Sequence, residues 1–337
     1  MPDWTQFVLA AIAIIFAGTR LTTRAGVLAR FFGFGVGWAG VLLLPLVTSL
    51  PELVTSLRAA GLGAPDLAAG NLLGSNVFNI LVIALVDLLQ GRGSLFTKIR
   101  EGHVLAASLG ITLTSVAIMG ILVPFPSFAA GRIGFDTLLL IGGYVGATVL
   151  LTRFEWRLDP KSLDDVVGRK RDGLTTGSRG KGGFPWRVLV EFILAALVIL
   201  VAGVALTDAA DGIATATGLG RTLVGTTMLA VATGLPEIVT TSTAARMGQL
   251  EMAIGNILGA NVMNMLVLAV VDLVYPESLL GSIAPTHAFT AVAAILLTSI
   301  AITGLIYRSK RSLGWLAYDS ILIGIGYLLT VYILFSS

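Results

Sequence analysis

The sequence predicts an all-α membrane protein with ten transmembrane helices, arranged as two inverted-topology repeats of five. Three observations support this fold class. The 337 residues are 55% hydrophobic and only 12% charged, about half the charged fraction of soluble domains. A polar motif at residues 45–79 returns at residues 230–264. Ten segments also meet or approach the length of about 20 apolar residues that a helix needs to cross a bilayer. They lie at about 6–20, 34–60, 68–89, 103–124, 133–152, 188–207, 220–245, 252–275, 286–307 and 314–335.

The two motifs belong to a duplication that covers most of the chain. LTSVAIMG at residues 113–120 matches LTSIAITG at residues 297–304, at nearly the same offset. Because each copy has five spans, an odd number, the second copy enters the membrane from the opposite side. We therefore divide the chain into a first repeat at 1–152, a linker at 153–187 and a second repeat at 188–337. Many secondary transporters have this organisation, with their site on broken helices near the midplane.

The basic residues predict the orientation. If the N-terminus lies outside, all 22 lysines and arginines except Arg58, Arg132 and Arg221 fall on the inner side. The positive-inside rule then places both termini outside and the linker in the cytoplasm. Because the charges concentrate in these loops, the net charge of +3 does not indicate nucleic-acid binding. The composition, rich in Ala, Gly and Arg, favours a prokaryotic inner membrane.

The elements of the first half follow in order. A helix at about 5–18 is followed by a basic loop, Arg20 to Arg30, on the inside. The second helix contains Pro45 and Pro51, and each proline removes a backbone hydrogen bond and kinks the helix. Such breaks are tolerated in a membrane where they line a cavity or pack against protein. The third helix contains the asparagines of the motif, and the fourth and fifth are polar-poor scaffold helices. The linker is a flexible connector, and the second half repeats this order.

Two glutamates lie near mid-span, each directly after a proline. A charged residue at the bilayer centre costs about 2.5–3.5 kcal/mol on insertion scales, and neither Glu52 nor Glu237 has a good basic partner in its own helix. A salt-bridged or protonated structural pair is the alternative. We favour two carboxylates that face each other and coordinate a cation. Oxygen-bearing side chains at helical spacing accompany them: Thr48 and Ser56 in one half, Thr233 and Thr241 in the other.

Asparagines continue this pattern on the next helix. Asn71, Ser75 and Asn79 form an oxygen-bearing stripe, which Asn256 and Asn264 repeat. Carboxylate, amide and hydroxyl oxygens suit hard cations, and Ca²⁺ takes 6–8 such ligands. The set contains no His, and the chain has no Cys, which argues against zinc, copper or iron. Glycines at positions 70, 74, 255 and 259 are expected to allow close helix packing.

TSLPEL followed by GNLLGSNVFN, duplicated in inverted halves, resembles the alpha repeats of the calcium/cation antiporter superfamily, which includes the sodium/calcium exchangers. The resemblance spans about 35 residues in each half. It implies alternating access around a central cation site, with Glu52 and Glu237 as principal Ca²⁺ ligands completed by Asn79 and Asn264. It also implies flanking Na⁺ sites, formed by Thr48, Ser49, Ser75 and Thr233.

The sequence departs from the family pattern at four positions. Val47 replaces the usual Gly, Gly234 and Ala260 replace two serines, and Asn264 stands where aspartate is frequent. The site then has two formal negative charges, which can neutralise one divalent ion, two sodium ions or two protons. Since buried carboxylates can also hold protons, proton coupling is the main alternative to sodium coupling.

We therefore expect a secondary antiporter that exchanges Ca²⁺, or a similar divalent cation, for Na⁺. Its partners are the lipid bilayer and inorganic cations, with no cofactor, no enzymatic activity and no obligate protein partner. An H⁺-coupled exchanger is the alternative, a passive cation channel a weaker one, and an intramembrane hydrolase is disfavoured. The choice of ion, the stoichiometry and the oligomeric state are left open.

Other polar residues also recur at the offset of the duplication. Asp87 and Asp272 concentrate cations at the vestibules or, at least as readily, are solvated at helix ends or paired with an arginine such as Arg92. The acidic pair Asp66 and Glu251 is expected to cap helices. The histidines at 103 and 287 are expected to pack at the interface.

Overall fold

The computed structural model describes residues 2–32, 34–90, 99, 102–123, 125–128, 133–157, 184–217, 232–308, 312–313 and 316–336. These residues are almost entirely helical. The helices are α1 Pro2–Phe31, α2 Val36–Trp38, the π-helical turn η1 Ala39–Leu43, α3 Leu44–Thr48, α4 Leu50–Gly61, α5 Pro65–Gln90, α6 Gly102–Leu122, α7 Phe135–Arg157, α9 Trp186–Thr217, α11 Leu235–Arg246, α12 Leu250–Val274, α13 Leu279–Ser282, α14 Thr286–Tyr307 and α15 Tyr318–Ser336. Two short antiparallel hairpins pair β1 Ser127–Phe128 with β2 Ile133–Gly134 and β3 Ser312–Leu313 with β4 Leu316–Ala317.

Eight helical segments of the described residues are long and apolar enough to cross a membrane, and a ninth, Tyr318–Leu334, is apolar but shorter. Eight of these nine agree with the expected spans to within a few residues, and only the first, which continues to Phe31, ends well beyond its expected range. The expected span at 220–245 is described only from residue 232, because residues 218–231 lie outside the described part of the chain. The count of ten spans and the inverted repeat therefore stay predictions.

The expected basic loop at 20–30 is wrong, since α1 continues through it to Phe31. The reason is an apolar stripe that continues along one face of the helix through the basic segment. Leu21, Ala25 and Leu28 are buried at helical spacing, and Arg24 forms an ion pair with Glu191 of α9. The arginines thus lie on the polar side of a helix. Helix α9 likewise continues to Thr217, beyond its expected end.

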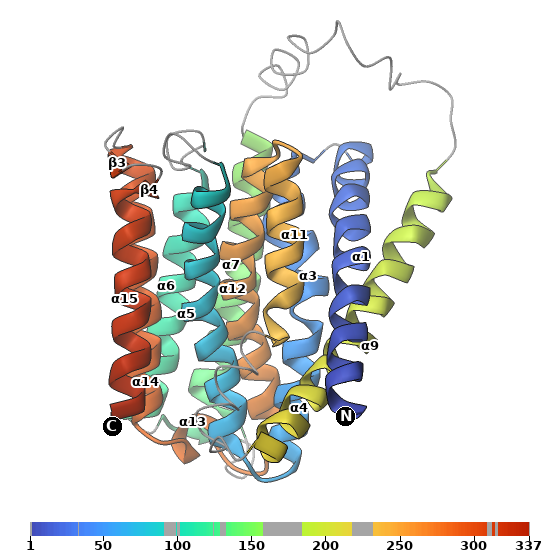
Figure 1. Ribbon diagram of the computed structural model, residues 1–337. Helices are drawn as coiled ribbons and strands as arrows, with labels where there is room; N and C mark the ends of the chain where they lie inside the picture. Colours follow the sequence, from blue (N-terminus) through green and yellow to red (C-terminus); the bar gives the residue numbers. More distant parts are fainter. Residues whose placement is uncertain are drawn as a thin grey trace, which may run out of the picture.

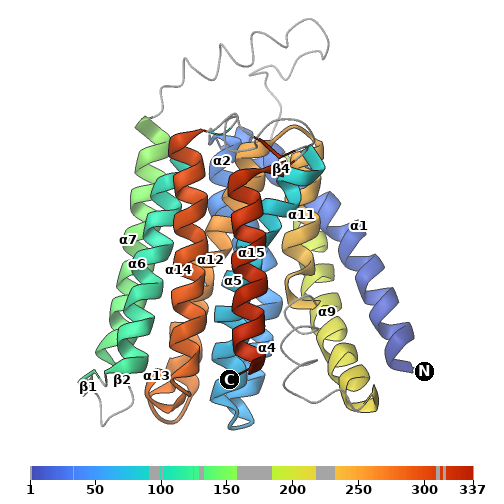
Figure 2. The same ribbon diagram turned by 60° about the vertical axis from the view of Figure 1, so that its left-hand side comes forward.

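α5 and α12 form the centre of the bundle. In the most apolar stretch of each, 78% of the residues are buried, whereas the corresponding share in the other spans is 28–56%. α1 and α9 pack against each other along one edge, and α6, α7 and α14 lie toward the opposite edge (Figures 1 and 2). α4 lies toward one end of the bundle and α11 toward the other (Figure 1). Together α4, α5, α11 and α12 place both polar motifs in the interior.

Glycines of α12 allow it to pack closely against the broken helix of the first half. A Cβ at Gly259 would lie 2.7 Å from Cγ of Pro45, and one at Gly255 would lie 3.0 Å from Val41. The close-packing prediction is therefore confirmed for these two glycines, and Gly70 lies against the ring of His287. It is wrong for Gly74, which has no other atom within 4 Å of its missing Cβ among the described residues.

Candidate functional site

Two helix breaks position the central carboxylates. The first half breaks at Ser49, between α3 and α4, and the second at Gly234, directly before α11. In each case a proline occupies the first helical turn, where its missing N–H is not needed. The following glutamate then lies in the N-terminal turn of its helix, where the helix dipole favours negative charge. Hence Glu52 and Glu237 occupy equivalent places on α4 and α11.

Both glutamates are buried, and neither has a counter-ion among the described residues. Each is 1% exposed, and they lie close enough for their charges to interact. In the described part of the chain neither forms an ion pair, and Oε2 of each has no hydrogen-bond partner. The alternative of a salt-bridged structural pair is therefore wrong for the described residues. Burying an unpaired charge is expensive, so a species that neutralises the pair would stabilise the site.

Hydroxyl groups from both halves surround the pair. Thr48 lies beside Glu237, and Thr233 lies beside Glu52, so each half contributes a threonine to the glutamate of the other. The hydroxyls of Thr48, Ser49 and Ser75 are buried and have no hydrogen-bond partner among the described residues. Thr233 donates to Oδ1 of Asn71 over 3.4 Å.

Two asparagines, Asn79 on α5 and Asn264 on α12, donate through their nitrogens and keep their oxygens without a partner among the described residues. Nδ2 of Asn79 donates to Oδ1 of Asn261 at 2.9 Å, and Nδ2 of Asn264 donates to Oδ1 of Asn76 at 2.9 Å. Oδ1 of Asn79 and Oδ1 of Asn264 are buried with no partner among the described residues. Asn76 and Asn261 were not predicted as site residues, although both recur in the duplicated motif, in GSNVFN and GANVMN.

Two of the hydroxyls expected on the ligand face have other partners. Ser56 accepts a hydrogen bond from Nδ2 of Asn71 at 3.1 Å. In the second half Asn256 donates to both Thr240 and Thr241 at 2.9 Å. These contacts join each broken helix to the helix that follows it, and they occupy the amide nitrogens of the outer asparagines.

The result is a buried site whose amide N–H groups already donate hydrogen bonds, whereas several of its oxygen atoms accept none from the described residues. The atoms that lack a hydrogen-bond partner in the described part of the chain are two carboxylate oxygens, amide carbonyl oxygens and hydroxyls. In the described ranges no group of three or more His, Cys, Asp or Glu side chains could hold a metal ion. The site therefore combines two negative charges with neutral oxygens, which is a ligand set suited to a hard cation.

The structure corrects the vestibule and the solvated helix-end interpretations of Asp87 and Asp272. Each is buried, at 1% and 2% exposure, so neither lines a vestibule nor is solvated at a helix end. Asp87 accepts hydrogen bonds from Ser320 and from the backbone N–H of Ala317. Asp272 accepts from the backbone N–H of Leu279 at 2.6 Å and from the hydroxyl of Thr137. They hold neighbouring chain segments, and the suggested partner Arg92 lies outside the described residues.

Asp66 and Glu251 lie in the first turn of α5 and α12, as expected for residues near a helix start. Each also contacts a histidine from the other half. His287 lies 3.0 Å from Asp66, and His103 lies 2.7 Å from Glu251. The histidines thus form polar contacts between helices, beyond the interfacial packing expected for them.

Comparisons with known proteins agree with this arrangement. A family model described as sodium/calcium exchanger protein matches residues 3–153 and 187–336. The inner membrane protein YrbG of Escherichia coli K12 is 29% identical over 96% of this chain and 92% of its own. The sodium/calcium exchanger MaX1 of Methanosarcina acetivorans is 26% identical over 88% of this chain and 91% of its own. A solved structure of the sodium–calcium exchanger NCX_Mj superimposes with a TM-score of 0.72, at 19% identity and 98% coverage of both chains, and so shows the same fold.

Proposed function

Because the chain belongs to the sodium/calcium exchanger protein family, we propose that this integral membrane protein exchanges Ca²⁺, or a similar hard divalent cation, for Na⁺. The main support is the buried pair Glu52 and Glu237, which lies among oxygens that lack donors. Two carboxylates neutralise one divalent ion or two monovalent ions. Both cargo ions need the same carboxylates, so one must leave before the other binds.

The remaining oxygens divide into a central and a flanking set. Asn79 and Asn264 complete the central Ca²⁺ site with their free carbonyl oxygens. The hydroxyls of Thr48, Ser49, Ser75 and Thr233 form flanking Na⁺ sites. The support is their burial, at the helix breaks for Thr48, Ser49 and Thr233 and within α5 for Ser75. Thr48, Ser49 and Ser75 also lack a hydrogen-bond partner for the hydroxyl among the described residues.

Alternating access requires elements that move relative to the site. We propose that α1 and α9 are these elements, since they pack against each other at one edge of the bundle and also contact α4 and α11 (Figures 1 and 2). The opposite placement of α4 and α11 supports the inverted duplication, with repeats at 1–152 and 188–337. The linker between them is cytoplasmic and both termini are outside in this proposal. The name of the relative YrbG supports an inner-membrane location.

Proton coupling is the second candidate function. It is favoured by Gly234 and Ala260, which supply no hydroxyl where the first half has Ser49 and Ser75. The second half then offers fewer oxygens for Na⁺, while the two carboxylates can still exchange one Ca²⁺ for two protons. A passive channel is less well supported, because both carboxylates are only 1% exposed, as expected for an occluded site.

The test measures Ca²⁺ uptake into proteoliposomes. One set is loaded with Na⁺ at equal pH, and another is loaded with K⁺ and given a pH gradient. Each set contains wild type, Glu52→Gln, Glu237→Gln or the control Asp208→Asn, which changes an exposed carboxylate outside the site. No cofactor or partner protein is added.

Uptake that needs the Na⁺ gradient, and that both glutamine variants lose, is the expected result. Uptake driven only by the pH gradient would show that H⁺, and not Na⁺, is the coupling ion. Ca²⁺ flux without either gradient would favour a channel. Wild-type rates in both glutamine variants would contradict the site assignment itself.

A further inference from the structure

We propose that Asn76 and Asn261 are positioning residues that fix the polarity of the cation site. They would orient the side-chain amides of Asn79 and Asn264 so that carbonyl oxygens, and not NH₂ groups, face the cation. This inference rests on the proposed function, and it concerns two residues that do not themselves contact the cargo.

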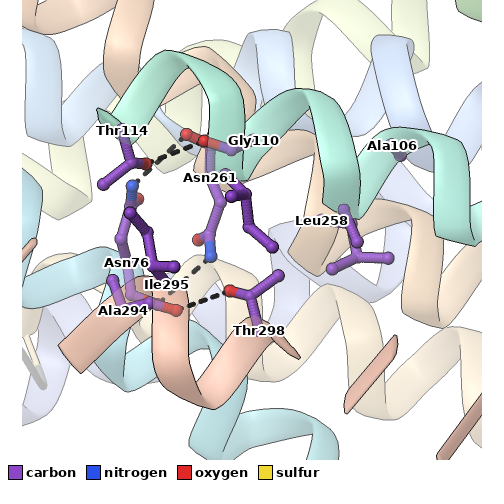
Figure 3. Close-up of a pocket in the computed structure, with 11 residues that line it drawn as sticks. Asn76, Ala106, Gly110, Thr114, Leu258, Asn261, Ala294, Ile295 and Thr298 are labelled. Atoms are coloured by element: carbon purple, nitrogen blue, oxygen red, sulfur yellow. Dashed lines mark hydrogen bonds between the residues drawn. The ribbon is translucent and has the colours of Figure 1, made fainter. Parts of the chain in front are cut away.

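The argument begins with two backbone carbonyls, which can only accept hydrogen bonds. Nδ2 of Asn261 lies 3.2 Å from the backbone oxygen of Asn76, and Nδ2 of Asn76 lies 3.4 Å from the backbone oxygen of Asn261 (Figure 3). Since a carbonyl oxygen facing another would have no proton between them, each amide must direct its nitrogen to this backbone oxygen. The orientation of both side chains is thereby set.

The orientation of Asn76 and Asn261 then determines the orientation of the two proposed ligands, Asn79 and Asn264. With its nitrogen committed to the backbone, Asn261 presents Oδ1 on its other side, and only a donor can pair with that atom. Asn79 therefore directs Nδ2 toward it, at 2.9 Å, and its own Oδ1 points elsewhere, buried and free. The same reasoning applies to Asn76 and Asn264, which are joined at 2.9 Å.

The four asparagines thus form a hydrogen-bonded chain across the contact between α5 and α12, which runs from Asn79 through Asn261 and Asn76 to Asn264. A small cavity between α5, α6, α12 and α14 adjoins Asn76 and Asn261 (Figure 3). Thr114 and Thr298 also line this cavity, but their hydroxyls donate to backbone oxygens of their own helices, Gly110 and Ala294. These two hydroxyls therefore donate no hydrogen bond to the asparagine chain, whose orientation follows, among the described residues, from the two backbone carbonyls.

Removing one positioning amide should weaken cation binding. In Asn261→Ala the Asn79 nitrogen loses its acceptor. Either the amide turns and presents NH₂ to the cation, or it keeps its orientation and buries an unsatisfied N–H, which is unfavourable. We expect the half-saturating Ca²⁺ concentration to rise about tenfold or more, equivalent to about 1.4 kcal/mol or more, with a smaller change in the maximal rate.

A second substitution separates positioning from other roles. A carboxylate has no donor and presents an oxygen on either side, so an aspartate at position 79 needs no orienting partner. We therefore expect Asn261→Ala to raise half-saturation about tenfold in the Asn79 background and less than about twofold in the Asn79→Asp background. Asn76→Ala combined with Asn264→Asp gives the same test from the other half, should either single alanine variant fail to fold.

The measurement is initial Ca²⁺ uptake in proteoliposomes at varied Ca²⁺, with thermal unfolding in detergent recorded for each variant. Thr114→Ala is the matched control, because it lines the same cavity and should leave half-saturation unchanged. An equal loss in both backgrounds, or no loss in either, would overturn the positioning role. Absence of driven Ca²⁺ uptake in wild type would instead contradict the proposed function.

Discussion

Replacement of Asp272 tests whether this buried carboxylate is a structural acceptor. In Asp272→Ala the backbone N–H of Leu279 and the hydroxyl of Thr137 lose their acceptor, and both residues are buried at 1% exposure or less. Each buried donor left unsatisfied costs about 1–3 kcal/mol, so the free energy of unfolding should fall by about 2–6 kcal/mol. The lower part of this range is expected, because the threonine hydroxyl can rotate toward a backbone oxygen. Asp272→Asn keeps one of the two oxygens and should lose about half as much.

The assay is thermal unfolding of the purified protein in detergent, followed by Ca²⁺ uptake per folded molecule. Asp208→Ala is the control, because Asp208 and Arg58 form an ion pair with side chains 46% and 61% exposed. Such a pair contributes about 0–1 kcal/mol. The structural role would be refuted if Asp272→Ala unfolded like the control while its half-saturating cation concentration changed. That result would restore a cation-concentrating role for Asp272.

Two further predictions concern close helix packing. Gly203→Val should slow exchange with little change in half-saturation, because a Cβ there would lie 2.5 Å from Cγ of Pro51 and separate α9 from the broken helix. The measurement is Ca²⁺ uptake into vesicles. The control Gly142→Val should leave the uptake rate unchanged, because no other described atom lies within 4 Å of a Cβ at that position. Gly259→Ala should lower the free energy of unfolding by about 1–3 kcal/mol through overpacking, whereas Gly74→Ala should not lower it. Equal unfolding midpoints in detergent for the two variants would contradict the packing argument.

The sequence predicted the elements whose signal is local. Apolar length located the spans, and the prolines located the break before Glu52. Burial of the two glutamates followed from their place in mid-span. Their ligand role, like the flanking Na⁺ sites, stays a prediction, which the free oxygens support but do not test.

The features that were missed depend on contacts between distant segments. Whether an asparagine such as Asn76 supplies its oxygen or its nitrogen depends on the residue that faces it across the contact between α5 and α12. Asp87 was expected to be solvated at a helix end, because the backbone N–H of Ala317 that it accepts from lies 230 positions away in the sequence. Helix α1 continued past its expected end because its apolar stripe is buried against other helices, while Arg24 forms an ion pair with Glu191 of α9. In each case the deciding partner lies far along the chain.

The balance of donors and acceptors explains why exchange, and not simple release, follows from this site. An empty site would hold two carboxylates that repel each other, with no basic residue paired to either among the described residues. In the proposed mechanism, a change of access from one side to the other with the site empty would keep an uncompensated buried charge, which is strongly unfavourable. A cation or protons must therefore occupy the site during each crossing. Since no basic residue among the described ones pairs with either glutamate, the compensating positive charge must come from bound ions, and in the proposed mechanism the return step requires a second ion.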